Sequence, residues 1–230
     1  MELYRDIDLP DPQIRTIGQM QPVLAVAGCN ASGPLYFMYR NLARTAEDRA
    51  WLAANQIRFD YTVIPPRTLC GEFTKTKGHY HPAAPDGTGY PELYQVLAGQ
   101  AEYLLQTRDS SYVVVVRAGP GDVVLVPPGY GHVTINPADT ELCMVNLVSE
   151  AFASEYAAYE EQQGAAYYHC TDGWMKNPQY GDAGDLTIRD APEFPEEGIV
   201  HGREIYELIG GDSLGFLNNP AEYAHLFRAF

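Results

Sequence analysis

Positive charge is scarce in this sequence, where 15 lysine and arginine residues stand against 30 aspartate and glutamate residues. Proteins bind nucleic acids and anionic membrane surfaces through positive charge, which displaces counterions. The composition therefore speaks against nucleic acid and membrane partners. The sequence also lacks any run of about 18 apolar residues, which a membrane-spanning helix would need.

Cysteine is scarce too, and the four residues Cys29, Cys70, Cys143 and Cys170 are widely scattered. No CxxC pair is present, which excludes the usual zinc knuckle or redox centre. Residues 1–20 show no basic segment followed by an apolar one, so the sequence gives no support for export. We therefore expect a cytoplasmic protein with reduced thiols, in which Cys143 is a small buried hydrophobe.

What the sequence does contain is a long β-rich region. Short runs of β-branched and aromatic residues, separated by Gly, Pro, Asp and Asn, follow one another for about a hundred residues from Ile57. Helical patterns do not alternate with them, which disfavours a parallel α/β sheet. We predict a mainly β fold, an antiparallel sandwich or barrel. The runs are IRFDYTVI, ELYQVLA, AEYLLQT, YVVVVR, DVVLVP, HVTIN and ELCMVNLV.

The flanking segments predict shorter elements. Residues 1–20 indicate an arm that orders only against another surface, and residues 21–40 a strand, a turn at 30–34 and a second strand. A helix is expected from Thr45, with Asp48 completing a capping box. Residues 1–56 would thus be an N-terminal extension with strands and one helix, packed on a barrel at 57–170.

The last third of the chain predicts little regular structure. We expect a helix from Ser154 to Gly164 and one more strand at 165–170. Residues 176–202 are rich in Pro, Gly and acidic residues, which indicates a surface segment. A short helix should begin at Pro220, with Asn219 as its cap. Residues 171–230 would form a C-terminal extension.

Two histidines one residue apart, His79 and His81, are the first sign of a site. In a strand they point to the same face, which is half of a metal site. Glu92 and His132 would complete three nitrogens and one carboxylate, a set suited to one divalent Fe, Mn, Ni or Zn ion. The alternative is that the pair is merely polar and half exposed.

The spacing of residues 121–136 resembles the second sequence motif of the cupin superfamily. The matching positions are Gly121, Pro127, Gly129, His132 and Asn136. HYH at 79–81, with Glu92 and Gly99, is similar to the first motif. The resemblance implies a jelly-roll β-sandwich or barrel in which His79, His81, Glu92 and His132 bind the metal.

One departure from many cupins is the ten-residue stretch 82–91 between the second histidine and the glutamate. Its Pro and Gly residues are turn formers, and loop length costs closure entropy only slowly. We expect a surface loop, or a lid over the metal.

Within the superfamily, residues 57–150 resemble the cupin-type phosphoglucose isomerases. Thr76, Lys77 and Gly78 lead into the histidine pair as in that family, and Tyr94 follows two residues after Glu92. The resemblance implies interconversion of glucose 6-phosphate and fructose 6-phosphate in a homodimer. It also implies that Glu92 is the catalytic base and that Tyr94 binds the sugar or phosphate.

A local excess of basic residues agrees with a phosphorylated hexose as substrate. Residues 40–77 hold seven of the fifteen Lys and Arg residues against four acidic ones. We expect Lys77, the Thr76 hydroxyl and the Gly78 amide to bind the phosphate. The alternative is a set of ordinary solvated charges. The seven are Arg40, Arg44, Arg49, Arg58, Arg67, Lys75 and Lys77.

Several alternatives stay open at this point. Aldose–ketose isomerisation can proceed by proton transfer at Glu92 or by a hydride shift with Glu92 only as a ligand. A cupin metal-dependent dioxygenase and a non-enzymatic sugar-binding cupin would use similar residues. Tyr156 and Tyr159 are expected in the core, and the alternative is that one of them contacts the substrate. We expect structural or surface roles for His169, His201 and His225.

Overall fold

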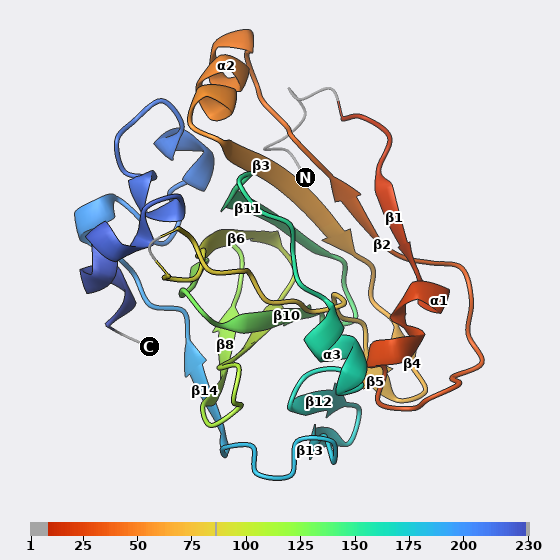
Figure 1. Cartoon of the computed structure of the whole chain (residues 1–230). Helices are drawn as coiled ribbons and strands as arrows, with labels where there is room; N and C mark the ends of the chain where they lie inside the picture. The colour runs from red at the N-terminus through yellow and green to blue at the C-terminus, as the bar shows by residue number, and fades with distance from the viewer. Residues whose placement is uncertain (1–8, 86, 229–230) are drawn as a thin grey trace.

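The computed structural model describes residues 9–85 and 87–228 and confirms a mainly β fold (Figure 1). The seven predicted runs form β3 and β6 to β11. The strands are β1 (Gln13–Thr16), β2 (Pro34–Tyr39), β3 (Ile57–Ile64), β4 (Thr68–Leu69), β5 (Glu72–Phe73), β6 (Glu92–Ala98), β7 (Ala101–Gln106), β8 (Val113–Ala118), β9 (Val123–Val126), β10 (Gly131–Ile135), β11 (Leu142–Ser149), β12 (Tyr167–Cys170), β13 (Gly173–Lys176) and β14 (Leu186–Asp190).

Helical segments are short. The α-helices are α1 (Ile17–Met20), α2 (Ala46–Ala54) and α3 (Ala157–Glu161), and the 3₁₀ segments are η1 (Gln21–Val23), η2 (Pro195–Glu197), η3 (Ile205–Leu208), η4 (Gly215–Leu217) and η5 (Pro220–Phe227). Helices within residues 9–85 and 87–228 fall short of the length and apolarity that a membrane crossing needs.

The largest sheet has the strand order β1-β2-β3-β11-β6-β9. Its strands pair antiparallel, with Asn146 of β11 opposite both Asp60 of β3 and Tyr94 of β6. Because opposite residues of paired strands share a face, Glu92, Tyr94 and Asn146 lie on one face. That face carries the polar residues of the site.

The other face of this sheet is apolar. Phe59, Leu93 and Leu147 are fully buried there and pack with Phe216 and Leu217 of η4. The C-terminal segments, blue in Figure 1, therefore cover the apolar face of the large sheet. Each strand alternates between the two environments, as the period of two requires.

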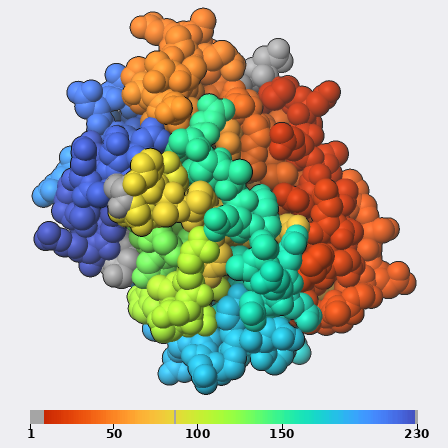
Figure 2. All heavy atoms as spheres, viewed as in Figure 1, coloured from red at the N-terminus to blue at the C-terminus, as the bar shows by residue number. Residues whose placement is uncertain are grey.

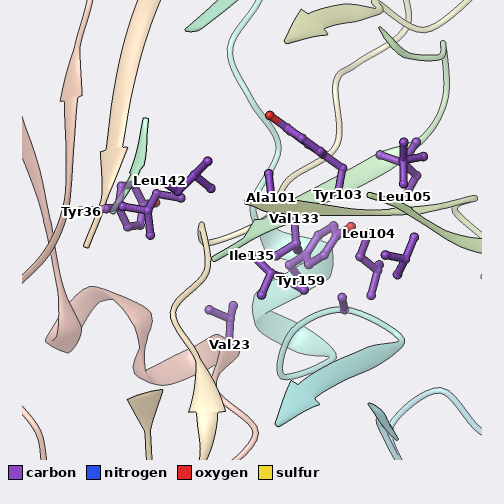
Figure 3. Packing of buried hydrophobic residues seen from close by; sticks show 14 of the residues in the cluster. Val23, Tyr36, Ala101, Tyr103, Leu104, Leu105, Val133, Ile135, Leu142 and Tyr159 are labelled. Atoms are coloured by element: carbon purple, nitrogen blue, oxygen red, sulfur yellow. The ribbon is translucent and has the colours of Figure 1, made fainter. Parts of the chain in front are cut away.

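A second sheet, of order β10-β7-β8-β14, faces the polar side of the first. The main core includes Val96 of the first sheet and Tyr103, Leu104 and Val133 of the second. Figure 3 shows Tyr159 of α3 beside Val133 and Ile135, under this sheet. Tyr159 is fully buried, as predicted for a core residue.

The N-terminal prediction is partly wrong. Residues 13–16 form β1, which pairs with β2, and Thr16 begins α1 with a capping box. Residues 21–23 form η1 rather than a strand, and Pro22 contributes by its fixed φ. Residues 1–8 of the expected arm lie outside the described residues.

The other helix predictions differ in detail. Thr45 caps α2 with Asp48 in a capping box, as predicted. The helix expected from Ser154 begins only at Ala157, because Glu155 forms a backbone bridge with Tyr80. The segment from Pro220 is a 3₁₀ helix, and the Asn219 side chain makes no capping hydrogen bond.

The expected surface segment 176–202 contains one more strand, and the strand predicted at 165–170 is β12. β14 pairs parallel with β8 and extends the second sheet. The domain boundaries 1–56, 57–170 and 171–230 stay a prediction, although β1 and β2 continue the sheet of β3.

The prediction of reduced thiols is wrong for two of the four cysteines. Cys29 and Cys70 form a disulfide across 41 residues of sequence, whereas Cys143 and Cys170 are free. The fold places the segment after η1 against the β4–β5 turn, which no spacing motif reveals. Because disulfides persist mainly in oxidising compartments, the cytoplasmic location has no support from the thiols and stays a prediction. Cys143 is buried, as expected.

Candidate metal centre

Three histidines and one glutamate meet between the two sheets, with one ligand-type atom of each within 4.8 Å of the others. We call His79, His81, Glu92 and His132 the ligand cluster. The Nε2 atoms of His79 and His81 are 3.1 Å apart. Oε2 of Glu92 lies 3.3 Å from Nε2 of both His81 and His132.

The backbone explains this convergence. His79 bridges His132 of β10 through two backbone hydrogen bonds of 3.3 and 3.1 Å. Glu92 opens β6 on the inner face of the large sheet. The cluster therefore draws on both sheets, so it forms only when the sandwich is closed.

Gly78 gives the backbone the conformation and the close packing that it needs just before His79. Its φ is +78°, and a Cβ there would lie 2.6 Å from Cγ2 of Val133 and 2.8 Å from the Tyr159 ring. Only glycine fits both the angle and the space. The structure thus gives Gly78 a packing role.

Hydrogen bonds orient two members of the ligand cluster. Nδ1 of His81 lies 2.9 Å from the carbonyl oxygen of Tyr90. A carbonyl only accepts, so Nδ1 carries a proton and Nε2 is the nitrogen that faces Glu92. Asn146 donates to Oε1 of Glu92 at 2.8 Å, which leaves Oε2 facing the histidines.

Burial sets the charge states. It lowers the pKa of His79 well below its usual value, aided by His132 and His81, and it also lowers the pKa of His132. Burial would raise the pKa of Glu92, but the adjacent His132 and His81 rings outweigh it and hold that pKa low. Burial and Glu92 raise the pKa of Tyr94 well above its usual value. At pH 7 the His79 and His132 rings are therefore neutral and face the Glu92 carboxylate.

This arrangement fits a divalent metal ion. Oε2 of Glu92 is buried without a hydrogen-bond partner, although the residue is ionised. Such an oxygen is costly unless a cation neutralises it. Three imidazole nitrogens and one carboxylate oxygen form a donor set that first-row divalent ions accept.

A cavity of about 300 Å³ opens beside the ligand cluster. Of the predicted substrate residues, it is lined by Thr76, Lys77 and Tyr94, whereas Gly78 is not in its lining. The Tyr94 hydroxyl lies 3.1 Å from Nε2 of His132. The Thr76 hydroxyl accepts from the backbone N–H of Thr134 at 2.9 Å.

Basic residues line the cavity, as the local charge excess suggested. Lys77 forms an ion pair with Glu160. Arg40 and Arg58 both contact Oδ2 of the fully buried Asp60, at 2.5 and 2.7 Å. This triad keeps one net positive charge at the cavity wall.

Sequence reasoning missed Arg15 as a contributor to the cavity, and it favoured the core for Tyr156, which lines the cavity instead. Arg15 donates to the Tyr36 hydroxyl at 3.2 Å and lies 5.7 Å from the centre of the Tyr156 ring. Among the described residues, no carboxylate forms an ion pair with Arg15. Tyr156, which Arg15 contacts, lines the cavity and does not lie in the core. Arg15 reaches the cavity because β1 pairs with β2, and the sequence gives no sign of that pairing register.

The remaining histidines lie outside the ligand cluster, and each pairs with one carboxylate. The pairs are His169 with Glu102, His201 with Asp122, and His225 with Glu197. His225 also groups with Glu196 and Glu197, all near the surface.

A β-sandwich whose inner face brings three histidines and a glutamate together defines the class, a cupin with a candidate metal centre. Residues 24–184 match the family model described as Glucose-6-phosphate isomerase (GPI). The chain belongs to this family.

Relatives of known name agree with this assignment. The chain is 31% identical over 127 residues to the glucose-6-phosphate isomerase of Thermococcus kodakarensis, which covers 54% of this chain and 65% of the relative. The enzymes of the same name from Thermococcus litoralis and Pyrococcus furiosus are each 32% identical over 106 residues, covering 46% of this chain and 53% of theirs. The chain thus spans about half to two thirds of the length of these relatives.

Solved structures resemble the chain more weakly. Oxalate decarboxylase of Bacillus subtilis matches with a TM-score of 0.39 and 20% identity over 52% of this chain and 27% of the other. Peruvianin-I, a cysteine peptidase from Thevetia peruviana latex, matches with a TM-score of 0.36 and 19% identity over 44% and 55%. Nothing about function follows from similarities this low.

Proposed function

We propose that this chain is a metal-dependent isomerase that interconverts glucose 6-phosphate and fructose 6-phosphate. The observation that carries the proposal is the ligand cluster in a cavity that also holds basic side chains. A cation site and an anion site in one cavity suit a sugar with a phosphate at its far end. Membership of the family supports the same substrate.

Glu92 and Tyr94 are the proposed catalytic residues. A bound divalent ion would act as a Lewis acid toward the sugar oxygens at C1 and C2. Asn146 donates to Oε1 of Glu92, so Oε2 is the oxygen left without a hydrogen bond. If Oε2 binds the ion, it is a weaker base, which would favour the hydride route; if it stays free of the ion, it can accept the proton. Tyr94 keeps its proton at pH 7 and can donate to a sugar oxygen.

The phosphate is proposed to bind between Lys77 and Arg15. Both cations approach the Tyr156 ring, at 5.3 and 5.7 Å from its centre. Lys77 and His79 are two positions apart in the sequence, so their Cα atoms lie within about 7 Å of each other. A phosphate there would share Lys77 with Glu160. The Thr76 hydroxyl and the Gly78 amide are the further proposed contacts.

The cofactor is proposed to be one divalent ion per chain, either Fe, Mn, Ni or Zn. The donor set accepts each of these, so availability decides among them. The homodimer is likewise a proposal, supported by β1, an edge strand on which Ile14 is 46% exposed.

A coupled assay tests the function directly. Protein stripped of metal and reloaded with single metals should convert glucose 6-phosphate and fructose 6-phosphate in both directions. Protein that binds metal but converts neither sugar contradicts the proposal. Oxygen consumption with candidate substrates would instead point to a dioxygenase. Solvent deuterium entering C1 or C2 requires proton transfer, whereas a fully retained C2 label requires a hydride shift.

A further inference from the structure

The loop between His81 and Glu92 closes on itself and returns beside its starting point. The N–H of Tyr90 donates to the carbonyl of Pro82 at 3.3 Å, and that of Ala84 to the carbonyl of Thr88 at 2.6 Å. Among its described residues, 82–85 and 87–91, none lines the cavity. These described residues therefore lie behind the cavity wall and do not cover the metal centre as a lid.

Close packing fixes the end of this loop. A Cβ on Gly89 would lie 2.3 Å from the backbone nitrogen of Gly129. The loop thus packs directly on the turn that precedes β10, the strand of His132. The loop is thus connected to His81 and Glu92 by the chain itself, and to the strand of His132 by packing.

Tyr90 contacts His81 through its backbone. The Tyr90 carbonyl accepts from Nδ1 of His81 at 2.9 Å, which selects the tautomer whose Nε2 faces Glu92. Partners of this kind orient metal-binding histidines and raise their affinity for the ion. The loop therefore supplies a group that the ligand cluster needs.

Two aromatic rings pack in a row beside the same histidine. Tyr90 stacks on Phe152 with ring centres 4.7 Å apart, and Phe152 lies 4.4 Å from the His81 ring. Phe152 follows β11 and lines the cavity. Figure 2 shows the loop, in yellow, directly beside the green-teal residues that follow β11. His81 is therefore restrained twice, by the hydrogen bond at its Nδ1 atom and by the contact of its ring with Phe152.

We propose that Tyr90 and Phe152 are positioning residues that hold His81 in the orientation that binds a divalent ion. We call this pair the aromatic wall. The inference rests on the metal centre of the proposed function and not on its isomerase chemistry. Without the wall, the His81 ring can rotate about its side-chain bonds, and the cluster loses an ordered ligand.

The test measures binding of Co²⁺ to metal-stripped full-length protein. Phe152→Ala removes the ring on His81, and Tyr90→Ala removes the ring behind it. Both should bind Co²⁺ about tenfold more weakly and change its visible absorption spectrum. Tyr90→Phe keeps the ring and should retain wild-type affinity and spectrum.

Trp174→Ala is the matched control, because Trp174 stacks on His169, 4.3 Å between ring centres, outside the ligand cluster. Wild-type affinity and spectrum in Phe152→Ala would overturn the inference, as would equal losses in Trp174→Ala. If Tyr90→Ala does not fold, Phe152→Ala decides alone, since Phe152 is only partly buried in a loop. Wild-type protein that binds Co²⁺ without isomerising sugar would contradict the proposed function alone.

Discussion

The six histidines fall into two groups of three that differ in what faces their ring nitrogens. In the ligand cluster, three rings converge on one carboxylate inside the sandwich. Elsewhere, each ring meets its own carboxylate, as His201 meets Asp122 at 2.8 Å. A histidine beside its own carboxylate has a polar partner already, whereas three rings that share one carboxylate leave ring nitrogens for a cation. Convergence, and not histidine content, marks the site.

The largest expected effect is the loss of one shared ring. His132→Ala should abolish stoichiometric metal binding and isomerase turnover, because the cluster then has no nitrogen from β10. Metal content after dialysis and the coupled assay measure this. His201→Ala is the matched control. A His132→Ala protein with full metal content and turnover would contradict the assignment.

Glu92→Gln tests the shared acid. It keeps the shape but removes the charge, so kcat should fall about 10²–10⁴-fold if Glu92 moves the proton. If Glu92 serves only as a ligand, metal affinity should fall and kcat at saturating metal should recover. Comparing metal affinity with kcat separates the two roles. No change in either quantity would remove Glu92 from the site.

Lys77→Met should raise KM for the phosphorylated sugar about tenfold with little change in kcat, because the ion pair acts on ground and transition states alike. Metal affinity should stay at the wild-type value. Lys176→Met, an exposed lysine that donates to the Ala183 carbonyl, is the control. An unchanged KM would exclude Lys77 from phosphate binding.

Acid should destabilise the protein through the ligand cluster. The folded state holds the pKa of His79 and His132 below the unfolded value of about 6.5. The unfolded chain therefore binds more protons as pH falls, and the metal-free protein loses stability below about pH 6.5. The loss is at most about 1.4 kcal/mol per pH unit for each ring. The contribution of Glu92 is fully present above its unfolded pKa of about 4.3 and is lost as the pH falls from there through its lowered folded pKa.

Denaturant unfolding of metal-free protein between pH 7 and pH 5 measures this slope. His132→Ala should show a shallower slope than the wild type. Stability that is constant or rises toward pH 5 would mean that the buried rings are already protonated.

The smallest effect is expected for the outer histidines. His201→Ala breaks a surface pair and should change the free energy of unfolding by less than about 1 kcal/mol, with metal binding unchanged. Thermal unfolding and metal titration check this. A loss of metal in this variant would erase the distinction between the two groups.

The sequence predicts the elements whose pattern is local. β-branched runs mark the central strands, Thr45 and Asp48 mark the start of α2, and the HxH spacing puts His79 and His81 on one face. Each of these signals lies within a few residues. Glu92 and His132 follow as candidate partners along the chain, and the resemblance to cupins supported that choice.

What the sequence could not predict depends on contacts between distant segments. The Cys29–Cys70 disulfide follows from how the segment after η1 lies against β5. Arg15 reaches the cavity because β1 pairs with β2 in one particular register. Tyr156 looks like a core residue from its helical spacing, but the delayed start of α3 turns it to the cavity. Pairing register and loop paths are global properties of the folded chain.

An X-ray absorption spectrum of protein loaded with one equivalent of Ni²⁺ tests the central claim most directly. Three imidazole rings and at least one oxygen around the ion are the result that the ligand cluster predicts. A spectrum with fewer than two imidazoles would contradict the claim that these histidines bind one ion together.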